Sequence, residues 1–402
     1  MIWTKSFYKV HHPWEVSSVD DFICPKCGNK DKRYIGFKHG QPYCRLCISF
    51  QGKEAKKDYS VRKGISLSLE YPLSTKQKEV SDSVLAAVCQ GKNVFIHAVT
   101  GAGKTELVYQ SMEYILKKQG HVGFATPRKD VVIDLEPRIQ QAFPKASVIS
   151  VYGEHTSRIE GDIICLTTHQ LYRYPKYFDL LIVDEIDAFP YKDNELLHSF
   201  FSRSLRGNYI LLSATPTKED LAGVENDNGV VVTLFERYHH GLLPLPEFVS
   251  SRLAFMKVQC LRLLASLLRQ NKPVFVFAPT IESGSRLYLF LSFFLKGGSF
   301  VCSESSNRAI DIERFKNGEL RYLVTTSILE RGVTVKDLQV IVFKADDDIY
   351  NQATLVQIAG RVGRKIGATS GKVYFIGEEK NLFVKGAIDE IERYNNESRQ
   401  NR

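Results

Sequence analysis

Short apolar runs, separated by stretches with helical spacing, fill the chain beyond residue 65. The first series predicts buried strands rich in Val, Ile and Leu at 93–100, 121–127, 147–153, 162–169, 178–185 and 208–216. A second series predicts strands at 273–280, 300–304, 322–327, 338–346 and 372–379. Strands that alternate with helices favour parallel sheets covered on both faces. The pattern therefore predicts an α/β fold with two parallel-sheet domains, joined near residues 225–245.

The apolar run LYLFLSFFL, residues 287–295, is less than half of the ~20 residues that cross a bilayer. It predicts a core helix between two strands or, alternatively, a docking face. The first residues, MIWTKSFYKVHHPWEVSS, lack the apolar core of a secretory signal. We therefore expect a cytoplasmic protein, in which disulfides are rare.

Four of the eight cysteines form two C-x-x-C pairs, Cys24 with Cys27 and Cys44 with Cys47, separated by sixteen residues. This spacing is typical of a four-thiolate structural zinc site. The alternative is a pair of redox motifs, but neither pair lies in a strand-to-helix context. A small N-terminal zinc ribbon is predicted, with His39 at its surface and not among the ligands. The single cysteines Cys89, Cys165, Cys260 and Cys302 are interpreted as core residues.

Basic residues concentrate in the same N-terminal segment. Residues 1–65 hold 13 Lys and Arg against 6 Asp and Glu, so that this segment contributes +7 of the net charge of +9. Cations interleaved with aromatic residues suit single-stranded nucleic acid; they are Lys26, Lys30, Lys32, Arg33, Lys38 and Arg45 beside Tyr34, Phe37 and Tyr43. The alternatives are an ordinary lysine-rich surface and aromatics that form the ribbon's small core.

The stretch AVTGAGKTE, residues 98–106, lies between a predicted strand and a predicted helix. Backbone N–H groups of such a loop wrap phosphate oxygens, and Gly101 and Gly103 permit close approach. Lys104 is predicted to reach the β- and γ-phosphates of ATP, and Thr105 to hold Mg²⁺. The first residue is alanine where G-x-x-x-x-G-K-[ST] has glycine, which is tolerable if its backbone torsion stays in an allowed region.

Two carboxylates follow the apolar run of LLIVDEID, eighty residues beyond Lys104. Asp184 is predicted to bind the magnesium, and Glu185 to polarise the attacking water as a general base. A third element is QIAGRVGR, residues 357–364. Arg361 and Arg364 are spaced i, i+3, so that on a helix they would share one face.

These arginines lie in the second predicted domain. If the domains close on the nucleotide, they can neutralise charge on the transferring phosphoryl group, an effect worth roughly 10³ to 10⁵ in rate. The alternative for an arginine pair at this spacing is surface salt bridges. Together the three elements predict an ATPase whose hydrolysis is tied to domain movement.

The ordered motifs across residues 73–364 resemble those of superfamily 2 helicases and translocases, which have two tandem RecA-like domains. The resemblance implies that Gln77 reads adenine and that further ATP contacts come from Thr100, Gly101, Ala102, Gly103, Gly332 and Gln357. In SAT, Ser213 and Thr215 would couple hydrolysis to domain closure. The strand-binding groove would be lined by Arg128, Thr168, Thr280 and Thr326.

DEIDAFP, TSILERGVTV, LVQIAGRVGR and the four-cysteine ribbon together resemble the ComFA family of late-competence ATPases. The resemblance implies a motor at the inner face of the membrane that draws single-stranded DNA through the uptake channel. It also implies a phosphoribosyltransferase-like partner and self-association into a homo-oligomer. The expected domains are a basic ribbon at 1–60 and motor domains at 61–228 and 229–402. In LSTKQ a serine replaces the family's more frequent threonine and proline, which bears on adenine specificity.

The rival interpretations are a DEAD-box RNA helicase, a primosomal-type DNA helicase and a zinc-ribbon DNA-binding adaptor with a weak or inactive ATPase. DEID and QIAGRVGR depart from the DEAD-box motifs, and the intact catalytic residues argue against the adaptor. No inserted wedge domain of evident size is visible in 402 residues. We therefore expect a DNA-stimulated ATPase that moves on single strands and unwinds duplex poorly.

Overall fold

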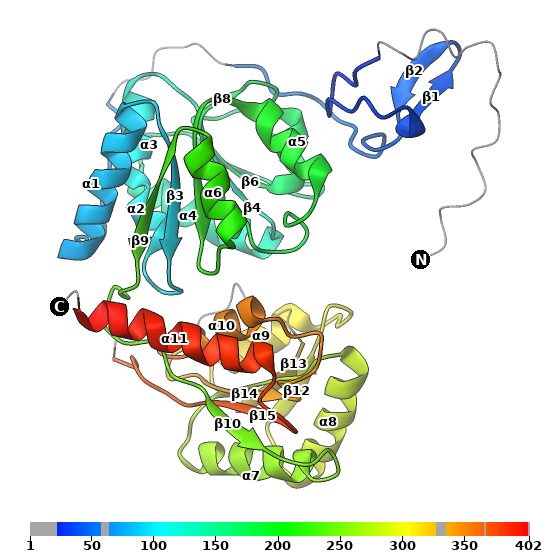
Figure 1. Ribbon diagram of the computed structural model, residues 1–402, viewed down its shortest axis with the longest axis vertical. Helices are drawn as coiled ribbons and strands as arrows, with labels where there is room; N and C mark the ends of the chain where they lie inside the picture. Colours follow the sequence, from blue (N-terminus) through cyan, green and yellow to red (C-terminus); the bar gives the residue numbers. More distant parts are fainter. Residues whose placement is uncertain (1–21, 58–63, 327–334, 366, 401–402) are drawn as a thin grey trace. The chain divides into compact units, whose positions relative to one another are not determined.

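A computed structural model describes residues 22–57, 64–326, 335–365 and 367–400 (Figure 1). The chain divides into two compact units. The first unit contains Met1–Ile65 and Ile115–Tyr209, and the second contains Ser66–Tyr114 and Ile210–Arg402. Among the described residues there is one antiparallel hairpin, one seven-stranded sheet and one six-stranded sheet.

The first unit begins with the cysteine-rich hairpin. The short helix η2 (Lys32–Tyr34) leads into β1 (Ile35–Lys38) and β2 (Gln41–Cys44). The remaining strands are β4 (Val122–Thr126), β5 (Val148–Val151), β6 (Ile163–Thr167) and β7 (Phe178–Asp184), which pair in parallel in the order β5-β6-β4-β7. The helices are α4 (Lys129–Ala142), η3 (Thr168–Arg173) and α5 (Glu195–Ser204), of which α4 packs on β4, β5 and β6.

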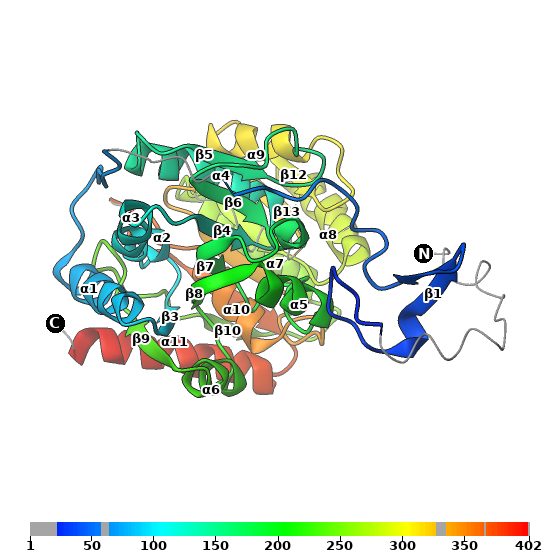
Figure 2. The ribbon, with the colours of Figure 1, turned by 90° about the horizontal axis from the view of Figure 1, so that it is seen from above.

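The seven-stranded sheet has the order β5-β6-β4-β7-β8-β3-β9. Its other strands are β3 (Asn93–Ala98), β8 (Leu205–Ser213), which spans the division between the units, and β9 (Gly229–Leu234). In the second unit β3 pairs in parallel with both β8 and β9. The helices here are α1 (Thr75–Cys89), α2 (Lys104–Leu107), α3 (Tyr109–Lys117) and α6 (Lys218–Asn226). Of these, α1 and α6 pack on β3 and β9 (Figure 2).

The six-stranded sheet belongs wholly to the second unit. Its parallel strands are β10 (Glu247–Ser250), β11 (Val274–Phe277), β12 (Gly298–Val301), β13 (Tyr322–Thr325), β14 (Gln339–Phe343) and β15 (Val373–Gly377), in the order β10-β15-β14-β11-β13-β12. The helices are α7 (Met256–Arg269), α8 (Ile281–Phe294), α9 (Arg308–Lys316), α10 (Gln352–Ala359) and α11 (Leu382–Gln400). An apolar core joins α7 and α8 to one face of this sheet, and α11 lies on the other side (Figure 1).

Each strand that the hydrophobic pattern predicts is present, which confirms two parallel sheets with a four-cysteine ribbon. In the two large sheets, two strands were not predicted: β9, which follows the NDNG turn, and β10, which has only four residues. The apolar run at 287–295 ends α8, between β11 and β12, as expected of a core helix. Leu287 and Leu291 are buried, whereas Phe293 is 85% exposed, so this helix is apolar on both faces.

Cys165, Cys260 and Cys302 are buried, as predicted for core residues. Cys89 is exposed, and its interpretation as a core residue was wrong. It is the last residue of α1, which turns Val84 and Val88 inward at helical spacing. The next position therefore falls on the outer face.

Candidate ATP-binding site and zinc centre

The predicted phosphate loop follows β3 directly. Its first residue, Ala98, is the last residue of the strand and has extended backbone, so this position does not need glycine. Gly101 and Gly103 have φ of +83° and +78°, a region that side chains with a Cβ rarely adopt. The Lys104 ammonium donates a hydrogen bond to the carbonyl of Ala98 at 3.0 Å. Lysine and glycines thus lie where the pattern predicts them, and the alanine carries no strain.

Gln77 braces this loop. Its side chain closes the capping box at the start of α1 and donates from Nε2 to the Ala102 carbonyl at 2.8 Å. A Cβ on Gly103 would lie 2.4 Å from the same nitrogen, so the glycine is also required by packing. Gln77 is 2% exposed. Its predicted contact with adenine stays a prediction.

Ser213 lies beside the phosphate loop at the edge of the sheet. In the parallel pairing of β3 with β8, His97 is opposite Ser213, so both strands end at the same level. Loops at the carboxyl ends of parallel strands are where ligands bind in open α/β sheets. Ser213 accepts a hydrogen bond from the backbone N–H of Thr215 at 3.0 Å, and both side chains are buried. This arrangement is compatible with the predicted coupling role.

Asp184, in the first unit, also lies at the carboxyl end of a parallel strand. Strands β4, β6 and β7 end together, because Thr126 pairs with Thr167 and Ala125 with Val183. Asp184 is the final residue of β7, as predicted. The chain then turns at Glu185, whose φ is +58° and whose backbone N–H donates to Asp184 Oδ1 at 2.9 Å. Both carboxylates therefore lie at the carboxyl edge of the sheet.

Two residues that were predicted to bind the nucleic-acid strand follow β-strands at the same edge of the sheet. Arg128 follows β4 and is the N-terminal cap residue of α4, partly exposed to solvent. Thr168 follows β6 but is fully buried, and its hydroxyl has no hydrogen-bond partner within the described segments. The predicted contacts of both residues with nucleic acid stay predictions.

The expectation that Arg361 and Arg364 share a helix face was wrong. Helix α10 ends at Ala359, and both arginines lie in the turn that follows. After Ala359 the backbone makes tighter turns, in which Arg361 N–H donates to Ile358 O and Val362 N–H donates to Ala359 O, and Gly363, with φ of +71°, ends them. Arg361 is 2% exposed, and Arg364 donates from Nε to the Gly360 carbonyl at 3.0 Å. We call residues 360–364 the finger segment.

The remaining predicted contacts are in the second unit. Gln357 is buried on α10, and Gly332 lies outside the described residues. Thr280 and Thr326 follow β11 and β13, which end together because Phe277 pairs with Thr325. Thr280 is exposed, caps α8 through a 3.0 Å hydrogen bond from the Ser283 N–H, and lines a cavity of about 600 Å³. Lys257, Arg286 and Lys344 line that cavity together with two carboxylates, Asp347 and Glu282, of which Glu282 pairs with Arg286.

The four cysteines of the ribbon converge. Cys24 Sγ lies 3.5 Å from Cys47 Sγ, and Cys27 Sγ lies 3.6 Å from Cys44 Sγ. All four sulfur atoms lie within 4.8 Å of one another. Zn–S bonds of about 2.3 Å in a tetrahedron place sulfurs about 3.8 Å apart, so the set fits zinc closely. These residues would hold the ion in a closed shell that leaves no position for substrate.

The cysteine thiols differ in how their surroundings shift the pKa. Burial opposes ionisation of Cys24, but backbone N–H groups of Cys27 and Lys26 lower the pKa of that thiol below its usual range. Burial raises the pKa of Cys27 to about 12. Gly28, with φ of +70°, donates its N–H to the Cys24 carbonyl at 2.8 Å, which closes the turn behind the first C-x-x-C pair. His39 is exposed and is not among the ligands, also as predicted.

The ribbon is anchored to the first unit through its exit segment. Phe50 packs edge-on against Phe200 of α5, with ring centroids 5.0 Å apart, and stacks over His169 at 6.2 Å. Ser199 and Arg203 of α5 donate hydrogen bonds to ribbon carbonyls. The ribbon thereby adjoins η3, which begins at the predicted strand-binding residue Thr168.

The basic residues of the ribbon that were predicted to bind nucleic acid differ in the contacts they already make. Lys26 donates to the Phe50 carbonyl and lies over the Tyr172 ring of η3 at 5.3 Å, so it ties the ribbon to η3. Arg33 pairs with Asp31 at 2.6 Å on the surface. Tyr43 covers Gly36, where a Cβ would lie 2.7 Å from its ring, and this supports the expectation that one aromatic belongs to the core.

Two buried residues near the loop were missed by sequence reasoning. Arg237 lies in the connection after β9, and its side chain reaches the carbonyl of Thr100. Tyr394 on α11 contacts His97 of β3 and the carbonyl of Ala214. A lone arginine beside HHG and a lone tyrosine in a polar helix carry no motif. Spatial proximity alone reveals them.

Comparison with known proteins identifies the family. Residues 70–218 match the family described as type III restriction enzyme, res subunit, and residues 256–366 match the helicase conserved C-terminal domain. Competence protein ComFA of Streptococcus pneumoniae is 33% identical over 395 residues, covering 94% of this chain and 91% of that protein. The chain belongs to the ComFA family. The Bacillus subtilis ComFA is 34% identical over 386 residues, covering 90% of this chain and 83% of the relative.

Among solved structures, S. cerevisiae Dbp5 bound to RNA and ADP BeF3 aligns with a TM-score of 0.61. It is 15% identical and covers 80% of this chain and 91% of its own, which shows the two RecA-like sheets of the helicase fold. The helicase domains and the family make this protein an ATP-dependent enzyme of the superfamily 2 helicase type, with ATP as its nucleotide. None of the described helices has the length and apolar character to span a bilayer.

Proposed function

We propose that the protein is an ATP-driven translocase that moves single-stranded DNA during uptake in natural transformation. The observation that carries the proposal is the phosphate loop itself: two left-handed glycines, a lysine held over the strand end, and Ser213 on the neighbouring strand at the same edge. The competence name belongs to the two relatives, which the chain matches over most of its length. Their role in competence supports the same role here.

In this proposal Lys104 contacts the β- and γ-phosphates, and Thr105 and Asp184 hold Mg²⁺. Glu185 polarises the attacking water, because an ionised carboxylate at the strand end can accept its proton. Arg361 and Arg364 neutralise charge that develops on the transferring phosphoryl group. When bound, the magnesium ion supplies further charge compensation there. We also propose the domain division 1–60, 61–228 and 229–402, with the second and third domains forming the motor.

The strand-binding surface is proposed to include Arg128 in the first unit and Thr280 in the second. The cavity beside Thr280 is lined by three cations and two carboxylates, and Arg286 pairs with one of these, so Lys257 and Lys344 are the cations proposed to bind the phosphate backbone. The ribbon adds cations and Tyr34, which is 40% exposed and available for base stacking. A phosphoribosyltransferase-like protein, the uptake channel and further copies of the chain are the proposed partners.

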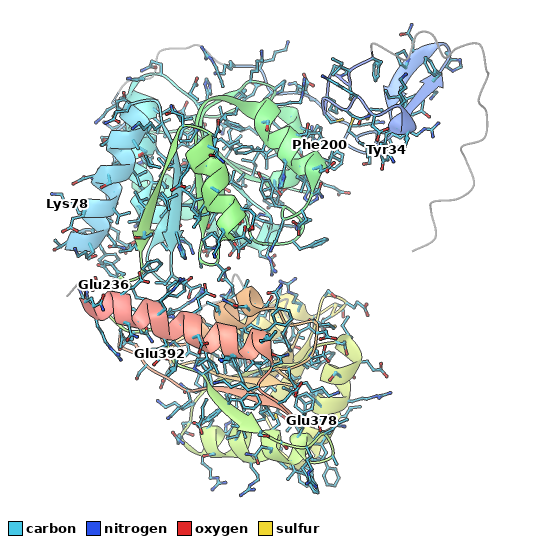
Figure 3. The ribbon with its side chains drawn as sticks, in the orientation of Figure 1. Tyr34, Lys78, Phe200, Glu236, Glu378 and Glu392 are labelled. Carbon is cyan, nitrogen blue, oxygen red and sulfur yellow. The ribbon has the colours of Figure 1, made fainter. Side chains whose placement is uncertain are left out.

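Steady-state ATPase activity, with and without single-stranded DNA, duplex DNA or RNA, tests the proposal. We expect strong stimulation by single-stranded DNA and turnover at background level in Lys104→Ala. Lys78→Ala is the matched control, since Lys78 is an exposed lysine of α1 (Figure 3). Stimulation by RNA in preference to DNA would favour an RNA helicase. Retained turnover in Lys104→Ala would contradict the site assignment.

A further inference from the structure

Arg237 is a wholly buried arginine in the connection between the two sheets. Its side chain is 1% exposed, which makes it one of the largest fully buried side chains among the described residues. Burying a guanidinium is costly unless its N–H groups and its charge are compensated. The identity of its partners therefore indicates what the residue is for.

Within the described part of the chain, every side-chain hydrogen bond of Arg237 goes to a backbone carbonyl. Nε donates to Thr100 O at 3.1 Å, and Nη2 donates to Gly360 O at 2.9 Å. Nη1 donates to Val362 O at 2.8 Å and to Gly363 O at 2.9 Å. Four bonds from one planar fork fix the positions of four carbonyls relative to one another.

No carboxylate is recorded as a partner of Arg237 in the described part of the chain. Burial, with a smaller contribution from Arg364, lowers its pKa to about 9, so the group stays protonated at neutral pH. An arginine kept for stability would be expected to pair with an acid. Here the charge is directed at peptide dipoles of two functional segments instead.

Those segments are the phosphate loop, which contributes Thr100, and the finger segment, which contributes the other three carbonyls. Two further contacts join the phosphate loop to its surroundings: Thr100 Oγ1 donates to Gly360 O at 3.3 Å, and the Tyr238 N–H donates to Gly101 O at 3.3 Å. The Gly360 carbonyl thus accepts from Arg237, from Thr100 and from Arg364.

The glycines of the finger segment match this arrangement. A Cβ on Gly360 would lie 2.0 Å from Thr100 Oγ1, and a Cβ on Gly363 would lie 2.6 Å from the Thr369 carbonyl. The close approach of loop and finger segment therefore depends on Gly360, whereas Gly363 lets the finger segment pack against Thr369 and Arg237. The residues that make this contact are far apart along the chain.

We propose that Arg237 is a positioning residue for ATP hydrolysis, which holds the backbone of the finger segment in register with the phosphate loop. The inference rests on the proposed function, because it assumes that Arg361 acts on the nucleotide bound at that loop. Arg237 does not itself act on ATP in this proposal: its donors are engaged by carbonyls, and its effect passes through Arg361. Lysine cannot replace it, because one ammonium cannot span four carbonyls in a plane.

The test compares Arg237→Ala and Arg237→Lys with Arg262→Gln, an exposed arginine of α7, in the full chain with single-stranded DNA. Misplacing a catalytic group by about 1 Å costs about 100-fold in rate. We expect kcat to fall by about that factor in both Arg237 variants, with ADP affinity nearly unchanged and Arg262→Gln like the wild type. Guanidinium, added far below denaturing concentrations, should partly restore kcat in Arg237→Ala.

A second measurement separates positioning from general stability. In an Arg361→Gln background, Arg237→Lys should add little further loss, because both changes remove the same contribution. If the losses in kcat from the two substitutions multiply fully in the double variant, the inference is overturned. A fall in ADP affinity that matches the fall in kcat would also overturn it. If Arg237→Ala does not fold, the Arg237→Lys comparison decides. If the wild type hydrolyses ATP and the Arg237 variants do so equally well, only this inference fails. If the wild type does not hydrolyse ATP, the proposed function fails as well.

Discussion

The hydroxyl of Tyr394 lies 3.0 Å from Nε2 of His97. Tyr394 belongs to the last helix, α11, whereas His97 belongs to the strand that leads into the phosphate loop. The same hydroxyl lies 3.3 Å from the carbonyl of Ala214, between Ser213 and Thr215. Phe235 stacks on the Tyr394 ring with centroids 4.8 Å apart and meets the His97 ring edge-on. The C-terminal helix is thus tied to both strand ends of the candidate site.

Replacing Tyr394 with Phe should remove these hydrogen bonds while keeping the ring stack. The buried His97 nitrogen and the Ala214 carbonyl would lose a partner, which costs about 1–3 kcal/mol. Urea denaturation of the full chain at neutral pH measures the loss in the free energy of unfolding. Tyr34→Phe, on the exposed face of the ribbon, is the control and should change it little. Equal losses in the two variants would contradict a specific role for the Tyr394 hydroxyl.

His97 makes stability depend on pH in the acid range. Burial, together with the charges of Arg393 and Lys104, lowers its pKa from 6.5 to about 4. Between these values the unfolded chain binds a proton that the folded chain excludes, so stability falls as the pH drops from 6.5 towards 4, by up to roughly 3 kcal/mol. Denaturation at a series of pH values should show this loss and a shallower one in His97→Gln. Identical profiles for the two proteins would refute the assignment, and His39→Gln should match the wild type.

Much of this architecture follows from local pattern. Buried parallel strands are continuous Val, Ile and Leu runs, so most of them are visible in the sequence. The phosphate loop was predictable in detail because its residues meet local requirements: Gly101 and Gly103 meet those of the backbone, and Lys104 meets that of charge. In contrast, β10 has four residues and no periodicity, and β9 follows directly on a turn, so neither stood out.

The finger segment shows where local reasoning fails. The spacing of Arg361 and Arg364 puts them on one face only if the helix continues, but α10 ends at Ala359 and the left-handed Gly363 ends the turns that follow. Arg237 was invisible for a different reason. An arginine near two histidines in a connecting segment suggests surface, and only the fold brings the Thr100 and Gly360 carbonyls around it. Contacts between segments that are distant in sequence carry no local signal.

Lys344→Ala tests the proposed strand-binding cavity beside Thr280. A lysine that neutralises one phosphate of a single strand contributes about 0.7 to the slope of log affinity against log salt concentration. We expect the slope to fall by about that amount, alike for all sequences, because phosphate contacts carry no base information. Fluorescence anisotropy with a labelled oligonucleotide at several salt concentrations measures it. Lys385→Ala, an exposed lysine of α11, should leave the slope unchanged, and an unchanged slope in both variants would exclude the cavity.

Cys24→Ala tests the zinc centre and its independence from the ATP site. Removing one of four thiolates should reduce bound zinc from about one ion per chain to near zero, because a structural site needs all four ligands. The ribbon depends on the ion for its folding, so limited proteolysis should cut within residues 22–57 and spare the rest of the chain. Basal ATPase activity should persist, whereas single-stranded DNA should bind more weakly. Cys89→Ala, at the exposed end of α1, should keep its zinc. A full equivalent of zinc in Cys24→Ala would rule out the four-thiolate site.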